Sequence, residues 1–439
     1  MKINNLSYRL LHAFLLLIFL IKAQDTINNF SNYVNLNDLF LNYEGGFLRR
    51  GLLGQIALLL YNNYDVNPLT YFSVLFIFVN FLFILTYLIC IDKFKDNIYL
   101  YFVLVLSPAT IMFYFYDSLN FFNSQLFINL AIVLHCLFAC RFFNNLKKYN
   151  TYLLIIIIPI IVINIFIYDV QLILIFCHVL ISFIVFQNNK KNFSKILIYY
   201  SIILIPAFFV IFNNGTEQNQ EAILEMRNSI INNFGFILSE HPESFNMTMD
   251  HGGNLNLKIG GMIKIFGIYF NYYEKLSLFS AIILSLFFFY FIFAYFIKNK
   301  IYNLNTNYSL VFLFFIPSLS LFMFVTDFGR SMHMILIHLI SFFCLLKIDK
   351  EKEKLFLKKL NFFNKNLIIL AIIAYTNFWT LTHAVGWHTI INPEPALEGI
   401  EHSSLMKELK KIPYHTYVIV DKNIFSLPKA EFMKPFLNY

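Results

Sequence analysis

The sequence predicts an all-α integral membrane protein, a polytopic bundle of about eleven transmembrane helices. Hydrophobic residues make up 59% of the 439 residues, charged residues make up only 13%, and the mean hydropathy is +0.64. A typical soluble domain has roughly 25% charged residues. Apolar runs of span length also recur along most of the chain. Lipid is therefore the expected surrounding of most of this protein.

The apolar runs have the length that a bilayer requires. A helix crosses the ~30 Å hydrocarbon core in about 20 residues, and about 17 is the lower limit. Spans are therefore expected at 7–23, 69–91, 98–116, 125–142, 151–168, 170–187, 196–212, 277–297, 308–325, 331–347 and 366–384. Lys22 stands where signal cleavage needs a small residue, so the first span is expected to stay uncleaved. The tight junction between two spans leaves open a broken or re-entrant helix within 151–187.

Alternate loops carry the lysine and arginine residues, and cytoplasmic loops are enriched in them. These loops hold Lys93 and Lys95, Lys147 and Lys148, Lys190 to Lys195, Lys298 and Lys300, and the cluster from Lys347 to Lys365. The N-terminus is therefore expected in the cytoplasm. Loops 24–68 and 213–276 are expected outside, as is a tail at 385–439 that follows the transmembrane domain of residues 1–384.

The most unusual segment of the first outer loop runs from Glu44 to Gln55. Its apolar part begins at Phe47 and continues for only about 15 residues, which is too short to span a bilayer comfortably. This pattern predicts a helix at 47–61 that lies in the outer membrane interface.

Two adjacent arginines, Arg49 and Arg50, stand in that segment on the side where positive charge is unusual. A guanidinium is suited to phosphate, and the glycines Gly45 and Gly46 let a headgroup approach the backbone. The segment thus predicts a phosphate or lipid-carrier site, with Glu44 as a candidate catalytic carboxylate. In the alternative interpretation, the arginines only anchor the helix among phospholipid headgroups.

A second group of ionisable residues stands between two expected spans. Asp327, Arg330 and His333 recur every three residues, and Thr326 is suited to cap the helix that would carry them. They share one helix face and form either a polar site or an Asp–Arg structural clamp. His338 comes five positions after His333, so the pair lacks the four-residue spacing of a metal site on one helix.

A third candidate is Asp169, flanked by Tyr168 and Gln171 at the outer end of two paired spans. Ionisable groups at membrane depth are functional candidates by default, so Asp169 is expected to support the site. His135 and His178 lie deeper in their spans, where a hydrogen bond between helices is favoured over catalysis.

The sequence indicates no cofactor and no metal site, although it leaves a divalent metal open. The five cysteines fall inside expected spans without a CxxC pair, and there is no P-loop, GxGxxG or HExxH motif. The net charge of +8 is spread over short clusters, so nucleic acid is not an expected partner. Membrane lipids are expected partners, and the loop 213–276 is long enough to form a lid that binds an acceptor.

Two of these segments resemble sequences from a group of uncharacterised bacterial membrane proteins. The stretch from Glu44 to Gly54 resembles a Gly-Gly-Phe-x-Arg-Arg-Gly-Leu signature, and Asp327 to Arg330 resembles the Asp-x-Gly-Arg sequence that recurs with it. The length, span number and Phe and Ile content also resemble bacterial O-antigen-type repeat-unit polymerases and C-type-fold membrane glycosyltransferases. The resemblance implies a bacterial inner-membrane protein that works on a polyprenyl-linked saccharide, alongside other envelope-glycan assembly proteins.

The resemblance also implies a reaction, which is transfer of a saccharide from a polyprenyl-(pyro)phosphate carrier at the extracytoplasmic face. Arg49, Arg50 and Arg330 would bind the carrier phosphate and stabilise the charge that develops on it. Glu44 or Asp327 would act as general base toward an acceptor hydroxyl. Two other classes stay open: a flippase for lipid-linked saccharides or small-solute transporter, and a non-catalytic membrane subunit.

Overall fold

The computed structural model describes residues 5–29, 39–47, 50–116, 121–186, 193–212, 221, 224–225, 228–229, 232, 302–303, 328–345, 347–348, 350–359 and 362–377. Within these ranges the regular secondary structure is helical, apart from an antiparallel pairing of β1 (Tyr302–Asn303) with β2 (Lys347–Ile348). The predicted all-α class is confirmed for this part of the chain. The expected spans 277–297 and 308–325, most of loop 213–276 and the tail 385–439 lie outside the described residues.

Several helices are long and apolar enough to cross a membrane. The described residues hold four, which cover Pro68–Phe94, Gln125–Phe142, Leu146–Ile167 and Ser194–Ile211. They agree with the predicted spans at 69–91, 125–142, 151–168 and 196–212, and they support a membrane-embedded protein. A shorter apolar helix, α10 (Gln171–Phe186), follows the third of them. The total of about eleven spans stays a prediction.

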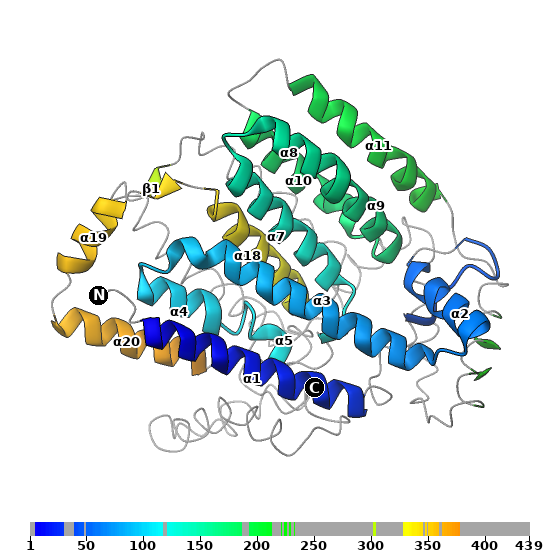
Figure 1. The fold of residues 1–439 in the computed structure, drawn as a ribbon, viewed down its shortest axis with the longest axis horizontal. Helices are drawn as coiled ribbons and strands as arrows, with labels where there is room; N and C mark the ends of the chain where they lie inside the picture. The colour runs from blue at the N-terminus through cyan, green and yellow to red at the C-terminus, as the bar shows by residue number, and fades with distance from the viewer. Residues whose placement is uncertain are drawn as a thin grey trace, which may run out of the picture.

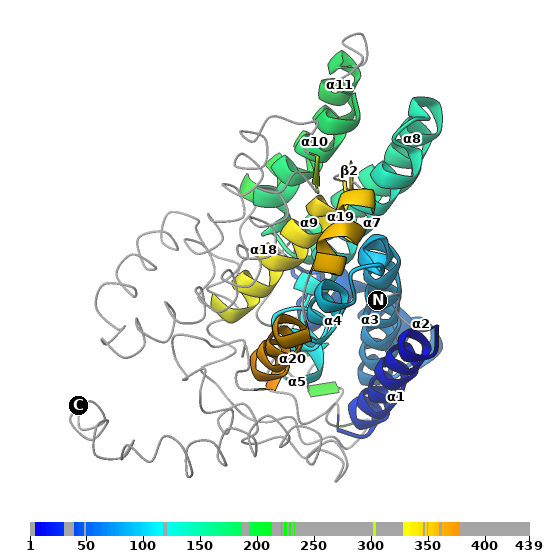
Figure 2. The same ribbon diagram turned by 90° about the vertical axis from the view of Figure 1, so that its left-hand side faces the viewer.

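The long helices lie side by side in a bundle (Figure 1). Helix α3 (Pro68–Ile91) packs along α7 (Gln125–Phe142), which also contacts α10 and α9 (Ile158–Ile167). Helix α11 (Phe193–Phe212) covers α9 and α10 at one edge, and α1 (Asn5–Asn29) covers α3 at the opposite edge (Figure 2). Helix α20 (Phe362–Asn377) packs on α4 (Ile98–Leu106).

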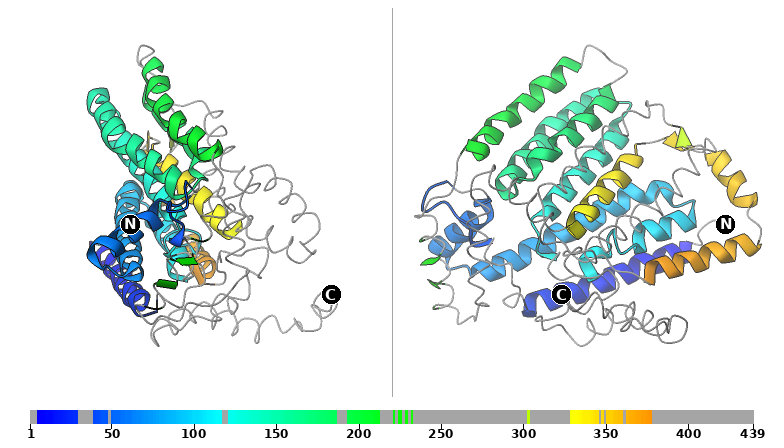
Figure 3. Two further views of the ribbon diagram at one scale, coloured as in Figure 1. Left: turned by 90° about the vertical axis from the view of Figure 1, so that its right-hand side faces the viewer. Right: turned by 180° about the vertical axis from the view of Figure 1, so that it is seen from behind.

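Helix α18 (Phe328–Phe343) packs against α7 and α3 (Figure 3). Every side chain from 329 to 344 is buried. Five of these buried side chains are polar or charged: Arg330, Ser331, His333, His338 and Ser341. Buried polar groups are costly unless they are hydrogen-bonded. His333 and Ser341 bond to backbone carbonyl oxygens, whereas both ring nitrogens of His338 are buried without a hydrogen-bond partner among the described residues.

The predicted span at 98–116 is wrong as a single helix. Helix α4 ends at Leu106, and α5 begins only at Phe113 and ends at Tyr116. Pro108 causes the break, because its ring disfavours a helical conformation in the preceding residue, and Ser107 has an extended ψ of 133°.

Side chains from other helices satisfy the backbone of this break. Tyr87 of α3 donates to the carbonyl oxygen of Leu104 at 3.0 Å, and His333 Nδ1 of α18 donates to that of Ala109 at 2.9 Å. The hydroxyls of Ser107 and Tyr375 lie 3.2 Å apart. Irregular backbone is tolerated at membrane depth only where protein or water satisfies it, and here α3, α18 and α20 supply the partners.

The segment 146–167 is also irregular. Helix α8 (Leu146–Tyr152) passes through a π-helical turn at Leu153–Ile157 into α9. The turn precedes Pro159, which has no N–H to donate and so cannot continue a regular ladder. Helix α9 ends at Ile167, and α10 starts after a tight turn at 168–170, so the pair forms two helices joined at one end of the bundle.

The loops predicted to share a side of the membrane meet in the structure. Lys350, at the start of α19 (Lys350–Lys359), forms an ion pair with Asp96 at 2.7 Å. Lys93 Nζ donates to the carbonyl oxygen of Cys344 at 2.7 Å. Lys350 lowers the pKa of the Asp96 carboxyl by donating a hydrogen bond to it. We call this region the lysine-rich end; its assignment to the cytoplasm stays a prediction.

Candidate functional site

The candidate site lies at the other end of the bundle, in the loop before α2 (Leu52–Tyr64). The helix predicted at 47–61 starts five residues later and ends three residues later than expected. The later start follows from Arg50, which has a left-handed φ of 66°. A right-handed helix cannot continue through this conformation, so α2 begins only after Arg50. The loop itself turns at Tyr43, where the Gly46 N–H donates to the Tyr43 carbonyl oxygen at 3.0 Å and Gly46 has a φ of 109°.

Helix α2 is pressed against the segment that precedes this turn. A Cβ added at Gly54 would overlap the carbonyl oxygen of Leu41 and come within 2.7 Å of that of Leu39. Gln55 Oε1 accepts a hydrogen bond from the Tyr43 N–H at 2.7 Å. Gly54 therefore permits the approach of helix and loop, and Gln55 fixes the position of the turn.

Arg50 and Asp169 form an ion pair that joins this loop to the α9–α10 turn. Asp169 Oδ1 lies 2.8 Å from Arg50 Nη2 and 2.9 Å from Nε. The Arg50 guanidinium also stands 4.4 Å from the centre of the Tyr168 ring. The Arg50 and Asp169 side chains are only 14% and 13% exposed, so water screens the pair weakly. The structure thus brings together two residues that the sequence suggested separately.

Aromatic rings surround the base of the loop. Phe47 packs 4.4 Å from Phe209 of α11 and 6.1 Å from Phe166 of α9, measured between ring centres. The Phe47 ring also stacks on that of Tyr43 at 5.3 Å. Burial raises the pKa of the Tyr43 hydroxyl well above its usual value, so Tyr43 stays neutral. The loop is anchored by apolar packing, which leaves its polar tip free to face solvent.

Glu44 occupies that tip. Its side chain is exposed, and its backbone N–H donates to Asn42 Oδ1 at 3.1 Å. Asn42 is fully buried and its amide donates to the Phe40 carbonyl oxygen at 3.1 Å. Asn42 therefore holds the backbone that carries the Glu44 carboxylate.

The remaining predicted site residues are distributed differently. Arg330 is buried on α18, with 6% of its surface exposed, rather than open at the mouth of the bundle. His333 follows one turn later and is 1% exposed. Its Nδ1 donates to the Ala109 carbonyl oxygen, and its ring stacks on that of Phe113. Asp327 and Arg49 lie outside the described residues. The structure joins Arg50 and Asp169, whereas Arg330 and His333 contribute to the core.

The hydrogen bonds between helices that the sequence favours for His135 and for His178 are present, and the two histidines bond to each other. The two Nδ1 atoms lie 2.9 Å apart and link α7 to α10. His135 Nε2 is also 2.8 Å from the Tyr149 hydroxyl, which is 3.0 Å from that of Ser182. Ser182 in turn lies 3.0 Å from the Tyr200 hydroxyl of α11. This buried network ties α7, α8, α10 and α11 together.

Replacing His135 by phenylalanine is expected to destabilise the bundle by about 1–2 kcal/mol, because buried polar partners lose a hydrogen bond. The measurement is thermal unfolding of the purified protein in detergent, followed by circular dichroism. The double variant with Tyr149→Phe is expected to cost less than the sum of the single variants. Tyr152→Phe is a suitable control, since that hydroxyl stands on α8 outside the network. An unchanged melting temperature for His135→Phe would contradict the role of the network.

The described residues contain no group of three or more His, Cys, Asp or Glu side chains that could hold a metal ion. Comparison of the chain with protein-family models, with curated proteins and with solved structures finds no match. The function is therefore argued from the residues of the site.

Proposed function

We propose that this protein is a membrane glycosyltransferase or polysaccharide polymerase that uses a polyprenyl-(pyro)phosphate-linked saccharide at the extracytoplasmic face. The observation that carries the proposal is the joined loop and turn, where Asp169 and Tyr168 hold Arg50 and the same loop exposes Glu44. A fixed guanidinium is suited to a phosphate, and an exposed carboxylate is suited to accept a proton. Helix α2, which follows the loop that carries both residues, lies at the end of the bundle opposite α19 of the lysine-rich end (Figure 1).

The proposed reaction is a displacement at the anomeric carbon of the donor sugar. The acceptor hydroxyl oxygen forms a bond to this carbon, and Glu44 takes the hydroxyl proton. The bond from the anomeric carbon to the carrier phosphate oxygen breaks, and its electron pair stays on the phosphate. Arg50 stabilises the negative charge that develops there, and Asp169 positions Arg50. The sequence also predicts phosphate binding by Arg49 and Arg330 and offers Asp327 as the alternative general base. Arg49 and Asp327 lie outside the described residues, and Arg330 is buried on α18.

The test is glycan synthesis with and without the protein. In a deletion strain, collapse of the surface-glycan ladder to single units is expected for a polymerase, and loss of one sugar is expected for a transferase. Purified protein in proteoliposomes is expected to extend a polyprenyl-diphosphate-linked saccharide. Normal glycan in the deletion strain together with no product in the proteoliposomes would overturn the proposal.

Glu44→Gln is expected to lower product formation at least about a hundredfold, in line with the usual contribution of a general base. Asp65→Asn is the matched control, because Asp65 is an exposed carboxylate at the other end of α2. Asn tolerates the left-handed conformation that Asp65 adopts, with a φ of 52°. Equal activity of the Glu44→Gln variant and the control would remove Glu44 from the mechanism.

A transporter is the second candidate, and one observation favours it. Among the described residues, His178 Nε2 and both ring nitrogens of His338 are buried without a hydrogen-bond partner. Such groups inside a membrane bundle are often part of a solute or proton path. Proteoliposomes separate the classes, since a transporter moves a lipid-linked saccharide or solute across the bilayer without forming a glycosidic bond.

A further inference from the structure

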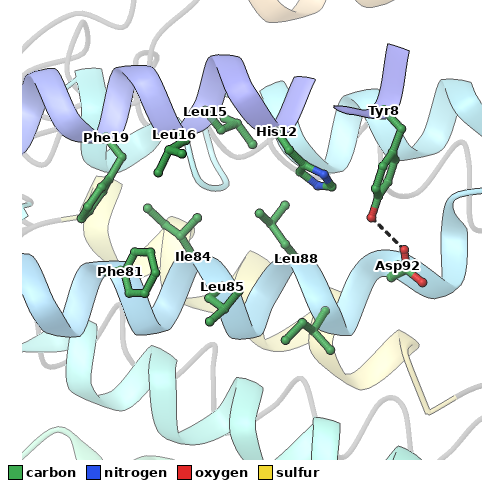
Figure 4. Close-up of a pocket in the computed structure, with 11 residues that line it drawn as sticks. Tyr8, His12, Leu15, Leu16, Phe19, Phe81, Ile84, Leu85, Leu88 and Asp92 are labelled. Atoms are coloured by element: carbon green, nitrogen blue, oxygen red, sulfur yellow. Dashed lines mark hydrogen bonds between the residues drawn. The ribbon is translucent and has the colours of Figure 1, made fainter. Parts of the chain in front are cut away.

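A groove runs between α1 and α3 (Figure 4). It has a volume of about 460 Å³. Phe19 and Phe81 close one end, with ring centres 5.8 Å apart. Tyr8 and Asp92 close the other end, where the Tyr8 hydroxyl donates to Asp92 Oδ1 at 2.8 Å. Between these ends the walls are aliphatic, formed by Leu15, Leu16, Ile84, Leu85, Leu88 and Ile89.

The polarity of the groove changes along its length. The middle and the Phe19 end carry only hydrocarbon side chains, whereas Tyr8, His12 and Asp92 gather at the lysine-rich end. An amphiphile has the same arrangement, with a polar headgroup joined to a hydrocarbon chain. The groove is open on its outer side, because Leu16 of α1 is 50% exposed and Ile89 of α3 is 50% exposed. In a membrane that side faces lipid.

The length of the groove indicates which kind of amphiphile fits it. From Phe81 to Asp92, eleven steps along α3 rise roughly 16 Å at about 1.5 Å per residue. This equals about half of the ~30 Å hydrocarbon core of a bilayer, which is the depth of one leaflet. The chain of a polyprenyl carrier is much longer than one leaflet is deep. The groove therefore fits one acyl chain of a lipid from the leaflet at the lysine-rich end.

The charge near the polar end indicates the headgroup. Arg9 is exposed on α1 beside Tyr8, and Lys95 is 54% exposed while it pairs with Asp92 at 2.8 Å. Asp96 also acts on Lys95, but it is paired with Lys350, and Lys93 adds a further cation nearby. Four cations against two carboxylates favour a lipid phosphate at this level. We propose that the groove binds one anionic phospholipid, with an acyl chain between α1 and α3 and its phosphate near Arg9 and Lys95.

The test measures lipid that stays bound to the full-length protein. The protein is purified in mild detergent, incubated with vesicles of equal phosphatidylglycerol and phosphatidylethanolamine, re-isolated, and analysed by native mass spectrometry. Leu16→Trp fills the groove and is expected to lower bound phosphatidylglycerol about tenfold. Leu17→Trp is the matched control, because Leu17 is 56% exposed on the same helix but does not line the groove.

A second pair of variants, on the facing helix α3, distinguishes loss of lipid binding from misfolding of a single variant. Leu85→Trp is expected to lower lipid binding as Leu16→Trp does, whereas Phe78→Trp, at an exposed position outside the groove, is expected to leave it unchanged. Arg9→Gln is expected to remove the preference for phosphatidylglycerol. Equal lipid retention by Leu16→Trp, Leu85→Trp and the two controls would overturn the proposal. Recovery of a polyprenyl phosphate in place of phospholipid would overturn it as well. None of these readouts depends on glycan synthesis.

Discussion

Replacement of Arg50 by alanine is expected to abolish polymerised surface glycan. The change removes the cation assigned to the carrier phosphate and leaves Asp169, which is 13% exposed, without the guanidinium that neutralises it. Breaking a fully buried pair costs about 3–5 kcal/mol, so about 1–3 kcal/mol is expected for this partly exposed one. Arg50→Lys keeps a charge but loses the planar fork over Tyr168, and it is expected to impair synthesis. The measurement is glycan chain length per amount of protein in the membrane.

Two further variants show whether Arg50 acts on the substrate or only holds the loop through its ion pair with Asp169. Arg50→Gly removes the guanidinium but suits the left-handed φ of 66°, so its stability is expected to exceed that of Arg50→Ala while synthesis stays absent. The exchanged pair Arg50→Asp with Asp169→Arg restores opposite charges across the same turn. We expect this exchange to recover thermal stability without glycan synthesis. Recovery of full-length glycan by the exchanged pair would show that the ion pair is only a clamp.

Replacement of Gly54 by alanine is expected to cause the largest loss of stability. The added Cβ would overlap the carbonyl oxygen of Leu41 and crowd that of Leu39, and backbone atoms cannot move aside as side chains do. Overpacking usually costs about 1–3 kcal/mol, and contact with two carbonyl groups places Gly54→Ala at or above the upper end. This loss outweighs the ~1 kcal/mol that alanine gains over glycine inside a helix.

The Gly54 prediction is measured as the yield of monodisperse protein in detergent and its melting temperature. Asn62→Ala is the control, since Asn62 is exposed on the same helix and the change raises helix propensity without new contacts. A normal yield and melting temperature for Gly54→Ala would show that α2 does not pack closely against segment 39–41.

The sequence predicted those parts of the fold that depend on local composition. The apolar runs at 69–91 and 125–142 form long helices, and the loops of Lys93 and Lys350 meet as their shared charge suggested. The expectation for 98–116 failed because length and hydropathy outweighed the Ser107–Pro108 dipeptide, although that signal was present. The residues that satisfy the broken helix, Tyr87, His333 and Tyr375, are brought to it by tertiary packing, which composition does not predict.

In the candidate site as well, the sequence indicated the local features but not the contacts that depend on tertiary packing. The segment around Arg50 stood out by its adjacent arginines, but its partner Asp169 is 119 positions away, and nothing local to either residue pairs them. The sequence reading also missed Asn42 and Gln55. Asn42 had a detectable signal, because asparagine often binds the backbone two residues further on, as it does with Glu44. Gln55 had none, because its contact depends on how α2 packs.

The broken helix at Ser107 also restricts the order in which the chain can be assembled. Two of its partners come from segments made long after it: His333 of α18 and Tyr375 of α20 follow it by 224 and 268 positions in contacts to Ala109 and Ser107. During synthesis, we expect the carbonyl group of Ala109 and the hydroxyl of Ser107 to lie at the insertion machinery or in contact with water until α18 and α20 have been made. We expect chains truncated before α18 to remain associated with the translocon and to be degraded. Stable insertion of segment 98–116 would then depend on the synthesis of α18 and α20.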